Sequence, residues 1–167
     1  MPADTSPPPD ARYVPTPTTR PGLVAAAYVV LRRDDEVLLQ LRQGTGYRDG
    51  FWALVAGHLE AGESIVDAAV REAAEEAGVV VDPADLRPLT TIHRFEVGGP
   101  PVEQRCDVFF EATRWRGEPA RLESDTAERI GWFSLDRLPE PVVPHELVVL
   151  EHLRDGTPVP AVLTVRT

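Results

Sequence analysis

The sequence predicts an α/β fold, and three observations support this class. Residues 23–31 (LVAAAYVVL) form a continuous apolar run typical of a buried strand, and shorter apolar runs recur along the chain. Residues 64–78 and 144–153 instead carry apolar side chains at helical spacing. The chain has 167 residues, 43% of them hydrophobic, which is enough for one domain with a proper core. Strands around one long helix, with a second helix near the C-terminus, favour an α/β/α sandwich.

The N-terminal third is predicted to hold a proline-rich arm followed by three strands. Residues 1–21 contain seven prolines and almost no large apolar side chains, so we expect a disordered or extended arm. Residues 23–31 and 37–41 flank a turn and are expected to form a hairpin. The Gly-rich residues 43–51 (QGTGYRDGF) read as a loop, and residues 51–56 as a short strand leading into Gly57.

The C-terminal half is predicted to hold three more strands and the second helix. Phe109 and Phe110 are expected on opposite faces of the sheet, because neighbouring strand residues point in opposite directions. The second helix has Pro144 near its start and Gly156 just past its end. We expect one domain over residues 22–156 and a loose tail over residues 157–167. The remaining strands are expected at residues 89–97, 102–113 and 130–135, with a turn at 83–86 and a loop at 115–124.

The long helix carries its own start and stop signals. Ser64 is a candidate N-cap with Asp67 three residues later, the spacing of a capping box, and Gly78 is a natural stop. At 100° per residue, one face gathers Glu72, Glu75 and Glu76 within about a third of the circumference. The opposite face is expected to dock on the sheet through Val66, Val70, Ala73 and Ala77.

Three carboxylates within about one helical turn repel one another. Two of them about 6 Å apart repel by roughly 3 kcal/mol at an effective dielectric near 20. Arg71 can offset part of that repulsion for Glu75, but it cannot serve all three. A hard divalent cation, Mg²⁺ or Mn²⁺, suits an all-oxygen ligand set. A solvated acidic helix face is the alternative interpretation of the helix alone.

The stretch from Gly57 to Gly78 resembles the Nudix box. Glu63, the pair Arg71-Glu72 and the pair Glu75-Glu76 fall at the spacings of that motif, between the two glycines. The chain is therefore similar to Nudix (MutT-like) hydrolases, over roughly residues 23–154. This resemblance implies an α/β/α sandwich with a mixed sheet. It also implies Mg²⁺-dependent hydrolysis of a nucleoside diphosphate linked to another moiety, with Mn²⁺ able to substitute.

The resemblance also implies roles for individual residues. Glu72, Glu75 and Glu76 are expected to bind the metal together with the Gly57 carbonyl, and one glutamate to act as general base. Glu63 and Arg71 are expected to pair and to orient the metal ligands. Residues 114–119 (RWRGEP) resemble a MutT-like segment, and counting on from them makes Glu123 a further catalytic candidate, with Asp125 and Glu128 as neighbouring alternatives.

Three residues are candidates for contact with the substrate: Arg42, Tyr47 and His58. Trp52, close to them in sequence, is expected in the core. The RWRGEP segment and the compact length favour a nucleoside triphosphate, cleaved to a monophosphate and pyrophosphate. A nucleotide sugar or another diphosphate ester is the alternative within the family. Two further classes are alternatives: a non-catalytic nucleotide-binding module, and an isomerase of the same fold that would use Cys106.

Composition limits the partners. The net charge is −10 and all 17 basic residues are arginines, so nonspecific nucleic-acid binding is not expected and a direct phosphate contact must come from Arg. No apolar run reaches the roughly 20 residues that span a membrane, and no signal peptide is recognised. Cys106 is alone, which favours a reducing, cytoplasmic location. We expect a small-molecule partner, and a homodimer stays open.

Overall fold

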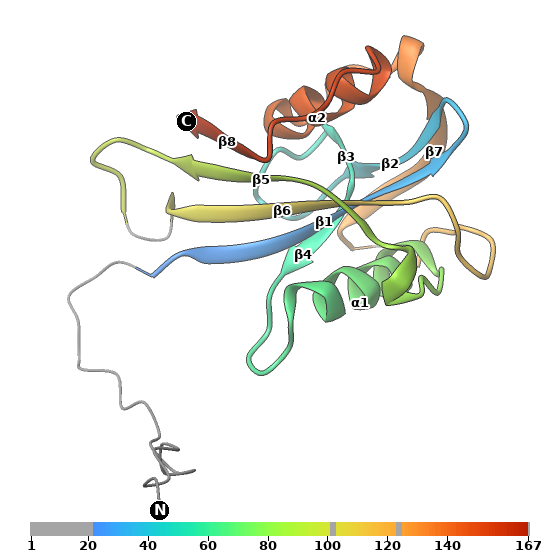
Figure 1. Ribbon diagram of the computed structural model, residues 1–167, viewed down its shortest axis with the longest axis horizontal. Coiled ribbons are helices and arrows are strands. Elements are labelled where there is room, and N and C mark those ends of the chain that lie inside the picture. Colours follow the sequence, from blue (N-terminus) through green and yellow to red (C-terminus); the bar gives the residue numbers. More distant parts are fainter. Residues whose placement is uncertain (1–21, 101–102, 123–124, 167) are drawn as a thin grey trace, which may run out of the picture.

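In the computed structural model, which describes residues 22–100, 103–122 and 125–166, one mixed β-sheet lies between two helices. Figure 1 shows α1 (Ile65–Ala77) on one face of the sheet and α2 (Pro144–Arg154) on the other. The predicted α/β/α sandwich is therefore confirmed. The strands are β1 (Val24–Arg33), β2 (Glu36–Arg42), β3 (Trp52–Ala53), β4 (Val55–His58), β5 (Arg87–Phe95), β6 (Arg105–Ala112), β7 (Ala127–Ser134) and β8 (Val162–Arg166).

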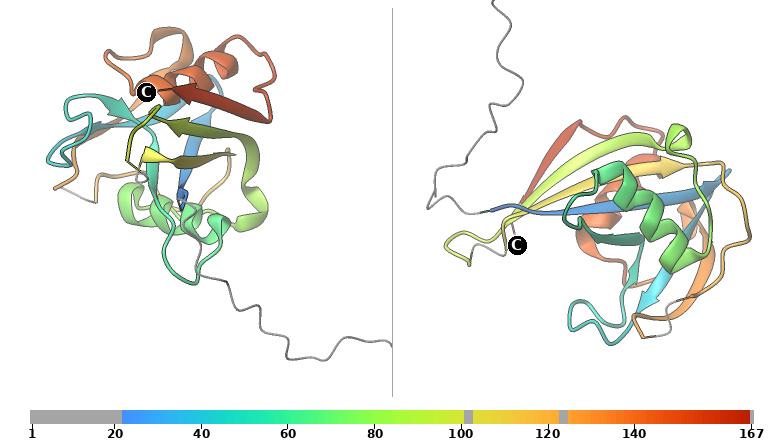
Figure 2. Two further views of the ribbon diagram at one scale, coloured as in Figure 1. Left: turned by 90° about the vertical axis from the view of Figure 1, so that its left-hand side faces the viewer. Right: turned by 90° about the horizontal axis from the view of Figure 1, so that it is seen from below.

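Strand β1 is the centre of the sheet. It pairs in parallel with β6, and antiparallel with β4 and the start of β2. The sheet runs in the order β3-β2-β1-β6-β5-β8, with β7 added to β2 and β4 to β1. The register of β4 places Gly57 opposite Ala27, so the start of the Nudix-like stretch is fixed to the middle of the sheet. The second view in Figure 2 shows α1 lying over this part of the sheet.

Alternate residues of β1 supply two separate cores. Tyr28 and Val30 face α2, where they pack with Phe109 and Leu150. The residues between them face α1 and belong to a second cluster that includes Phe110. The expectation that Phe109 and Phe110 point to opposite faces is thus confirmed.

Helix α1 has the predicted caps but a rotated buried face. The Ser64 side chain accepts a hydrogen bond from the Asp67 backbone, the reciprocal bond closes the capping box, and Gly78 ends the helix at φ 71°. The predicted docking face is wrong in part, because Val66 and Val70 are only partly buried. The sheet covers Ala68, Ala69, Ala73, Ala77 and Glu72 instead. Small side chains let the helix come close, and this rotation turns Glu72 inward.

The C-terminal segment differs from the expectation of a loose tail. Residues Val162–Arg166 form β8, which pairs in parallel with β5 at the edge of the sheet. Leu163 and Val165 pack against the α2-side core, while Val162 stays 66% exposed. The expected strand at 51–56 is divided into β3 and β4. Residues 1–21 lie outside the described part of the chain.

Short 3-10 turns lie at Pro83–Asp85 and Leu135–Arg137. Neither they nor the two helices are long and apolar enough to cross a membrane.

Replacing Leu163 by Ala tests whether β8 belongs to the core. We expect a loss of about 1–2 kcal/mol of unfolding free energy, because a partly buried aliphatic group is removed from the α2-side core. Thermal unfolding followed by circular dichroism measures the change. Val162→Ala is the matched control on the exposed side of the strand, and equal stability of both variants would contradict packing of β8.

Candidate active site

Arg71 is the centre of the acidic face of α1. Its Nη1 donates hydrogen bonds to Glu72 Oε1 at 2.6 Å and to Glu75 Oε2 at 2.9 Å. One oxygen from each of two carboxylates therefore converges on a single cationic nitrogen. Glu72 is buried and Glu75 is half exposed, so the pair runs from the sheet out to solvent.

The other guanidinium nitrogens of Arg71 hold the loop before the helix. Nη2 and Nε donate to the two oxygens of Glu63 at 2.8 and 3.2 Å, and Nη2 also donates to the His58 carbonyl at 3.1 Å. These hydrogen bonds lower the pKa of the Glu63 carboxyl. The structure thus contains the predicted pair of Glu63 and Arg71, which ties the end of β4 to α1.

Glu76 points away from this group toward the sheet. Its Oε2 accepts hydrogen bonds from Gln40 Nε2 at 2.8 Å and from the Ala56 backbone N–H at 2.9 Å. Gln40 is 5% exposed, so its amide is held firmly by the core. Glu76 therefore fixes one turn of α1 to β2 and β4, directly before Gly57.

Gly57 lets Glu72 approach the backbone of β4. A Cβ atom at this position would lie 1.7 Å from Glu72 Oε1 and 2.0 Å from its carboxyl carbon, far inside any real contact. Only glycine at position 57 is compatible with this placement of Glu72. The carboxylate of Glu72 and the β4 backbone consequently share one small space beside the central strand β1.

The chemistry of these residues suits a hard divalent cation, because Glu72, Glu75 and the Gly57 carbonyl offer only oxygen ligands. One oxygen of Glu72 and one of Glu75 already lie within hydrogen-bond distance of the same cationic nitrogen, Arg71 Nη1. Within residues 22–100, 103–122 and 125–166, no three His, Cys, Asp or Glu side chains are arranged as a complete metal cage. A cation would therefore compete with Arg71 for the oxygens of Glu72 and Glu75.

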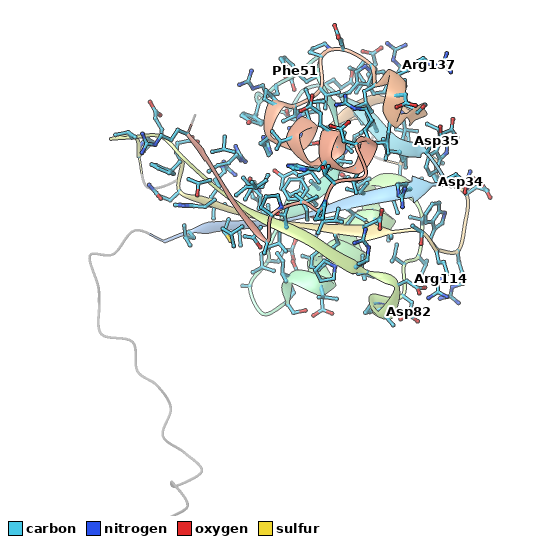
Figure 3. All side chains as sticks on the ribbon, turned by 45° about the horizontal axis from the view of Figure 1, so that its top comes forward. Asp34, Asp35, Phe51, Asp82, Arg114 and Arg137 are labelled. Carbon is cyan, nitrogen blue, oxygen red and sulfur yellow. The ribbon has the colours of Figure 1, made fainter. Side chains whose placement is uncertain are left out.

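A cavity of about 360 Å³ opens on the α2 face of the sheet, beside the same strand β4. The loop between β2 and β3 borders it, and Figure 3 places Phe51, at the end of that loop, on the α2 side, away from Asp82 and Arg114. Strand β4 contributes Ala56, Gly57 and His58 to the cavity lining, and Gly57 also lies against Glu72 of α1. The cavity is lined by Ala26, Tyr28, Arg42, Thr45, Tyr47, Ala56, Gly57, His58, Arg94, Arg105 and Glu146.

Three arginines make the cavity cationic within an acidic protein. Arg42 donates to Thr45 Oγ1 and to the Tyr47 carbonyl, which positions the loop. Arg94 is 5% exposed and donates to Asp107 Oδ2 at 2.5 Å. Arg105 donates to His58 Nε2 at 2.9 Å.

His58 can accept that hydrogen bond only as the neutral ring. Burial and the neighbouring Arg105 guanidinium lower its pKa, which favours this form. The Arg105 guanidinium therefore stays beside the cavity with a neutral partner rather than a carboxylate.

Glu146 is the carboxyl group in the cavity wall. It lies in the first turn of α2, is 3% exposed, and its Oε2 accepts a hydrogen bond from the Leu54 N–H at 2.5 Å. Burial raises its pKa to about 8, against the opposing effect of the Leu54 N–H and Arg42. Its neighbour His145 is buried with a pKa lowered to about 3, chiefly by burial, and its Nε2 lies 3.2 Å from the Tyr28 hydroxyl.

The predicted site residues fall into two groups in space. Glu72 and Glu75 meet at Arg71, together with Glu63, whereas Glu76 is directed to Gln40 and Ala56. The three predicted substrate-contact residues all line the cavity. Trp52 is buried in the core, as expected. Glu123 lies outside the described residues, and its alternatives Asp125 and Glu128 are both exposed.

Sequence reasoning missed the polar residues that come from the sheet and from α2. Gln40, Arg94 and Glu146 each stand within a predicted strand or helix, where motif spacing gives them no role. The available signal was a charged or amide side chain inside an otherwise apolar segment, which often indicates a buried polar contact. His145, the neighbour of Glu146 in the first turn of α2, is also buried.

Comparisons with known proteins agree on one family. The family model of the NUDIX domain matches residues 22–153. The chain is 34% identical over 135 residues to a protein named NAD-capped RNA hydrolase NudC from Pseudomonas aeruginosa, covering 81% of this chain and 44% of that protein. It is 37% identical over 112 residues to a Danio rerio protein named oxidized purine nucleoside triphosphate hydrolase, covering 66% of each. The chain thus spans less than half the length of the NudC proteins from Pseudomonas that it matches.

A solved structure shares the fold. The crystal structure of the MutT NUDIX hydrolase from Burkholderia pseudomallei superposes with a TM-score of 0.70 at 27% identity. The match covers 78% of this chain and 97% of that one.

Glu146→Gln tests the burial of a carboxyl group beside the cavity. Because the folded-state pKa is raised, the native protein binds one more proton than the unfolded chain between about pH 4.5 and pH 8. Wild-type stability should therefore fall with rising pH through this window relative to the variant, and level off above it. Thermal unfolding at several pH values measures the difference. Glu151→Gln, on the same helix but outside the cavity, should track the wild type, and a pH-independent difference for Glu146→Gln would contradict the raised pKa.

Proposed function

Because the chain belongs to the Nudix family, we propose that it hydrolyses a phosphoric anhydride bond in a nucleoside diphosphate linked to another group. The single observation that carries this proposal is the convergence of Glu72 and Glu75 on one cationic nitrogen beside Gly57. A pyrophosphate bridge bound through a cation would use the same oxygens. The cavity on the other side of β4 can then hold the nucleoside.

Mg²⁺, or Mn²⁺ in its place, is the cofactor we propose, held by Glu72, Glu75, Glu76 and the Gly57 carbonyl. When bound, the cation neutralises charge on the phosphoryl oxygens and favours deprotonation of a water. Glu76 would have to share the oxygen that now accepts from Gln40 and Ala56, or use its other one. Arg71 keeps the glutamates directed toward this space and, once they bind the cation, still holds Glu63.

The reaction needs a water placed in line with the bridging oxygen. The water adds to one phosphorus atom, the bond from that phosphorus to the bridging oxygen breaks, and the water proton passes to a carboxylate. We propose that one of the α1 glutamates takes this proton. Glu123 remains a further candidate on the loop before β7. Arg42 and His58 would contact the substrate from the cavity side, where Arg42 can donate to a phosphate or a base.

A nucleoside triphosphate is the substrate we propose, giving a monophosphate and pyrophosphate. The relative named oxidized purine nucleoside triphosphate hydrolase supports this class. The alternative is a nucleotide joined to a sugar or to a second nucleotide, which the relatives named NAD-capped RNA hydrolase favour. A substrate panel containing triphosphates, nucleotide sugars and dinucleotides, incubated with and without Mg²⁺ and read out by chromatography of the products, decides between them. A triphosphate gives a monophosphate and pyrophosphate, a nucleotide sugar gives a monophosphate and a sugar phosphate, and a dinucleotide gives two monophosphates.

Removing the charge of each α1 carboxylate tests the catalytic assignment. Glu72→Gln, Glu75→Gln and Glu76→Gln should each lower kcat/KM by two or more orders of magnitude, because each removes a ligand or a base. The readout is pyrophosphate release, with circular dichroism to confirm folding. Chelator should abolish wild-type activity and Mg²⁺ or Mn²⁺ should restore it. A variant that keeps near-full activity would remove that residue from the site.

Gly57→Ala tests the close approach of Glu72 to β4. The added Cβ would overlap the carboxylate, so Glu72 must move away from the strand. We expect weaker Mn²⁺ binding by calorimetry and at least a tenfold loss of activity. Gly22→Ala is the matched control, because an added Cβ there meets no atom within 4 Å and the variant should behave as wild type. Gly62 is not used, because its φ of 91° would strain any other residue. Unchanged Mn²⁺ affinity in Gly57→Ala would show that this placement of Glu72 is not needed.

A further inference from the structure

We propose that Gln40 is a positioning residue for the metal site, which fixes the carboxylate of Glu76 in the place where it binds the cation. This inference rests on the proposed function, because it requires that Glu76 is a metal ligand. Gln40 lies in the middle of β2, where it is paired with Ala53 of β3 and with Ile130 of β7. Its side chain reaches α1, because Nε2 donates a hydrogen bond to Glu76 Oε2 at 2.8 Å.

Gln40 places an amide where β2 otherwise carries buried apolar side chains. Leu39 and Leu41 are buried in the cluster on the α2 side of the sheet. Leu38, which shares a face of the strand with Gln40, belongs to the cluster that faces α1. Gln40 itself is 5% exposed. Burying an amide costs free energy unless it is hydrogen-bonded, so the hydrogen bond to Glu76 is what makes an amide favourable at this position.

The contacts of Gln40 Nε2 fix the orientation of its amide. Nε2 lies 2.8 Å from Glu76 Oε2 and 3.4 Å from the Leu54 carbonyl, and both of these oxygens accept hydrogen bonds. The NH₂ group must therefore face them, because turning the amide over would set its oxygen against two acceptors. The Ala56 N–H donates to the same Oε2 at 2.9 Å. Two donors from different strands thus hold one carboxylate oxygen.

Glu76 differs from the other two proposed glutamate ligands in the kind of donor that holds it. Glu72 and Glu75 accept from Arg71 Nη1, a cationic group with which a metal ion would compete. Oε2 of Glu76 instead accepts from two neutral N–H groups, which can stay in place while the carboxylate binds a cation. A ligand that is already fixed loses less conformational freedom on binding. Glu76 is therefore the preorganised ligand of the set.

The same hydrogen bonds set the position of Glu76 relative to the β4 backbone. Ala56 directly precedes Gly57, whose carbonyl is another proposed ligand. Loss of the Gln40 donor would remove one restraint on Oε2 and allow the carboxylate to rotate. Removing an outer contact of this kind typically changes metal affinity or activity by about 10–100-fold. Gln40 should therefore affect metal affinity although it is not one of the proposed ligands.

Calorimetric titration of the full-length protein with Mn²⁺, without substrate, tests this role. Gln40→Met keeps the length of the side chain and removes the N–H donor. We expect its Mn²⁺ affinity to fall by about 10–100-fold. Mn²⁺ should also raise its unfolding temperature less than that of the wild type.

Thr90→Val is the matched control for the loss of a buried hydrogen bond. Thr90 is also 5% exposed and donates to the Pro160 carbonyl at 2.6 Å. It lies on β5, which β1 and β6 separate from β2 in the sheet. Thr90→Val should lower the unfolding temperature and leave the Mn²⁺ affinity unchanged.

Two further backgrounds show whether Gln40 acts through Glu76. In Glu76→Gln the proposed ligand is already lost, so adding Gln40→Met should weaken Mn²⁺ binding little further. In Glu75→Gln, which keeps Glu76, adding Gln40→Met should cost its full factor. If Gln40→Met fails to fold, Gln40→Asn takes its place, because it withdraws the donor by one methylene group and keeps the amide.

Four outcomes would overturn the inference: no Mn²⁺ binding by the wild type, wild-type Mn²⁺ affinity in Gln40→Met, an equal loss in Thr90→Val, or an undiminished loss when Gln40→Met is added to Glu76→Gln. The proposed function fails separately, if the wild type with Mg²⁺ or Mn²⁺ hydrolyses none of the substrates in the panel. The Mn²⁺ titrations need no turnover, so they test the role of Gln40 in either case.

Discussion

The five hydrogen bonds of Arg71 are the interaction on which the candidate site depends. One guanidinium holds Glu63 in the loop, the carbonyl of His58 at the end of β4, and Glu72 and Glu75 on the helix. Without a positive charge, the carboxylates on neighbouring turns would repel one another and the loop would lose its link to the helix. Arg71 thus sets both the charge balance and the geometry of this face.

Strand β4 connects the two halves of the site. Its Ala56 N–H holds Glu76, its Gly57 leaves space for Glu72, and its His58 borders the cavity and accepts from Arg105. Because β4 is paired with the central strand β1, these groups are attached to the middle of the sheet. In the function proposed above, the phosphates of the substrate lie toward α1 and its nucleoside lies in the cavity on the α2 side, with this short strand between them.

The polar groups on the α2 face are arranged differently from those on the α1 face. Around α1 three carboxylates pair with one arginine, whereas the cavity has three arginines and one carboxyl in its wall. Asp107 forms an ion pair with Arg94, whereas Arg105 donates to the ring of His58 and has no ion pair with a carboxylate among the described residues. This cationic cavity gives an acidic protein a place for an electron-rich, acceptor-bearing group.

The sequence by itself determined the fold class, the caps of α1, the Nudix-like spacing and the pairing of Glu63 with Arg71, because each depends on residues near one another along the chain. It also singled out Arg42, Tyr47 and His58, which the fold brings to one cavity. Tertiary structure decided the rest. Four features depend on contacts between segments that are distant in sequence. The rotation of α1 buries Glu72, and Gln40 on β2 donates a hydrogen bond to Glu76. Strand β8 pairs with β5, and Glu146 of α2 lines the cavity. Such contacts depend on which faces of the sheet and helices meet, and local periodicity carries no information about that choice.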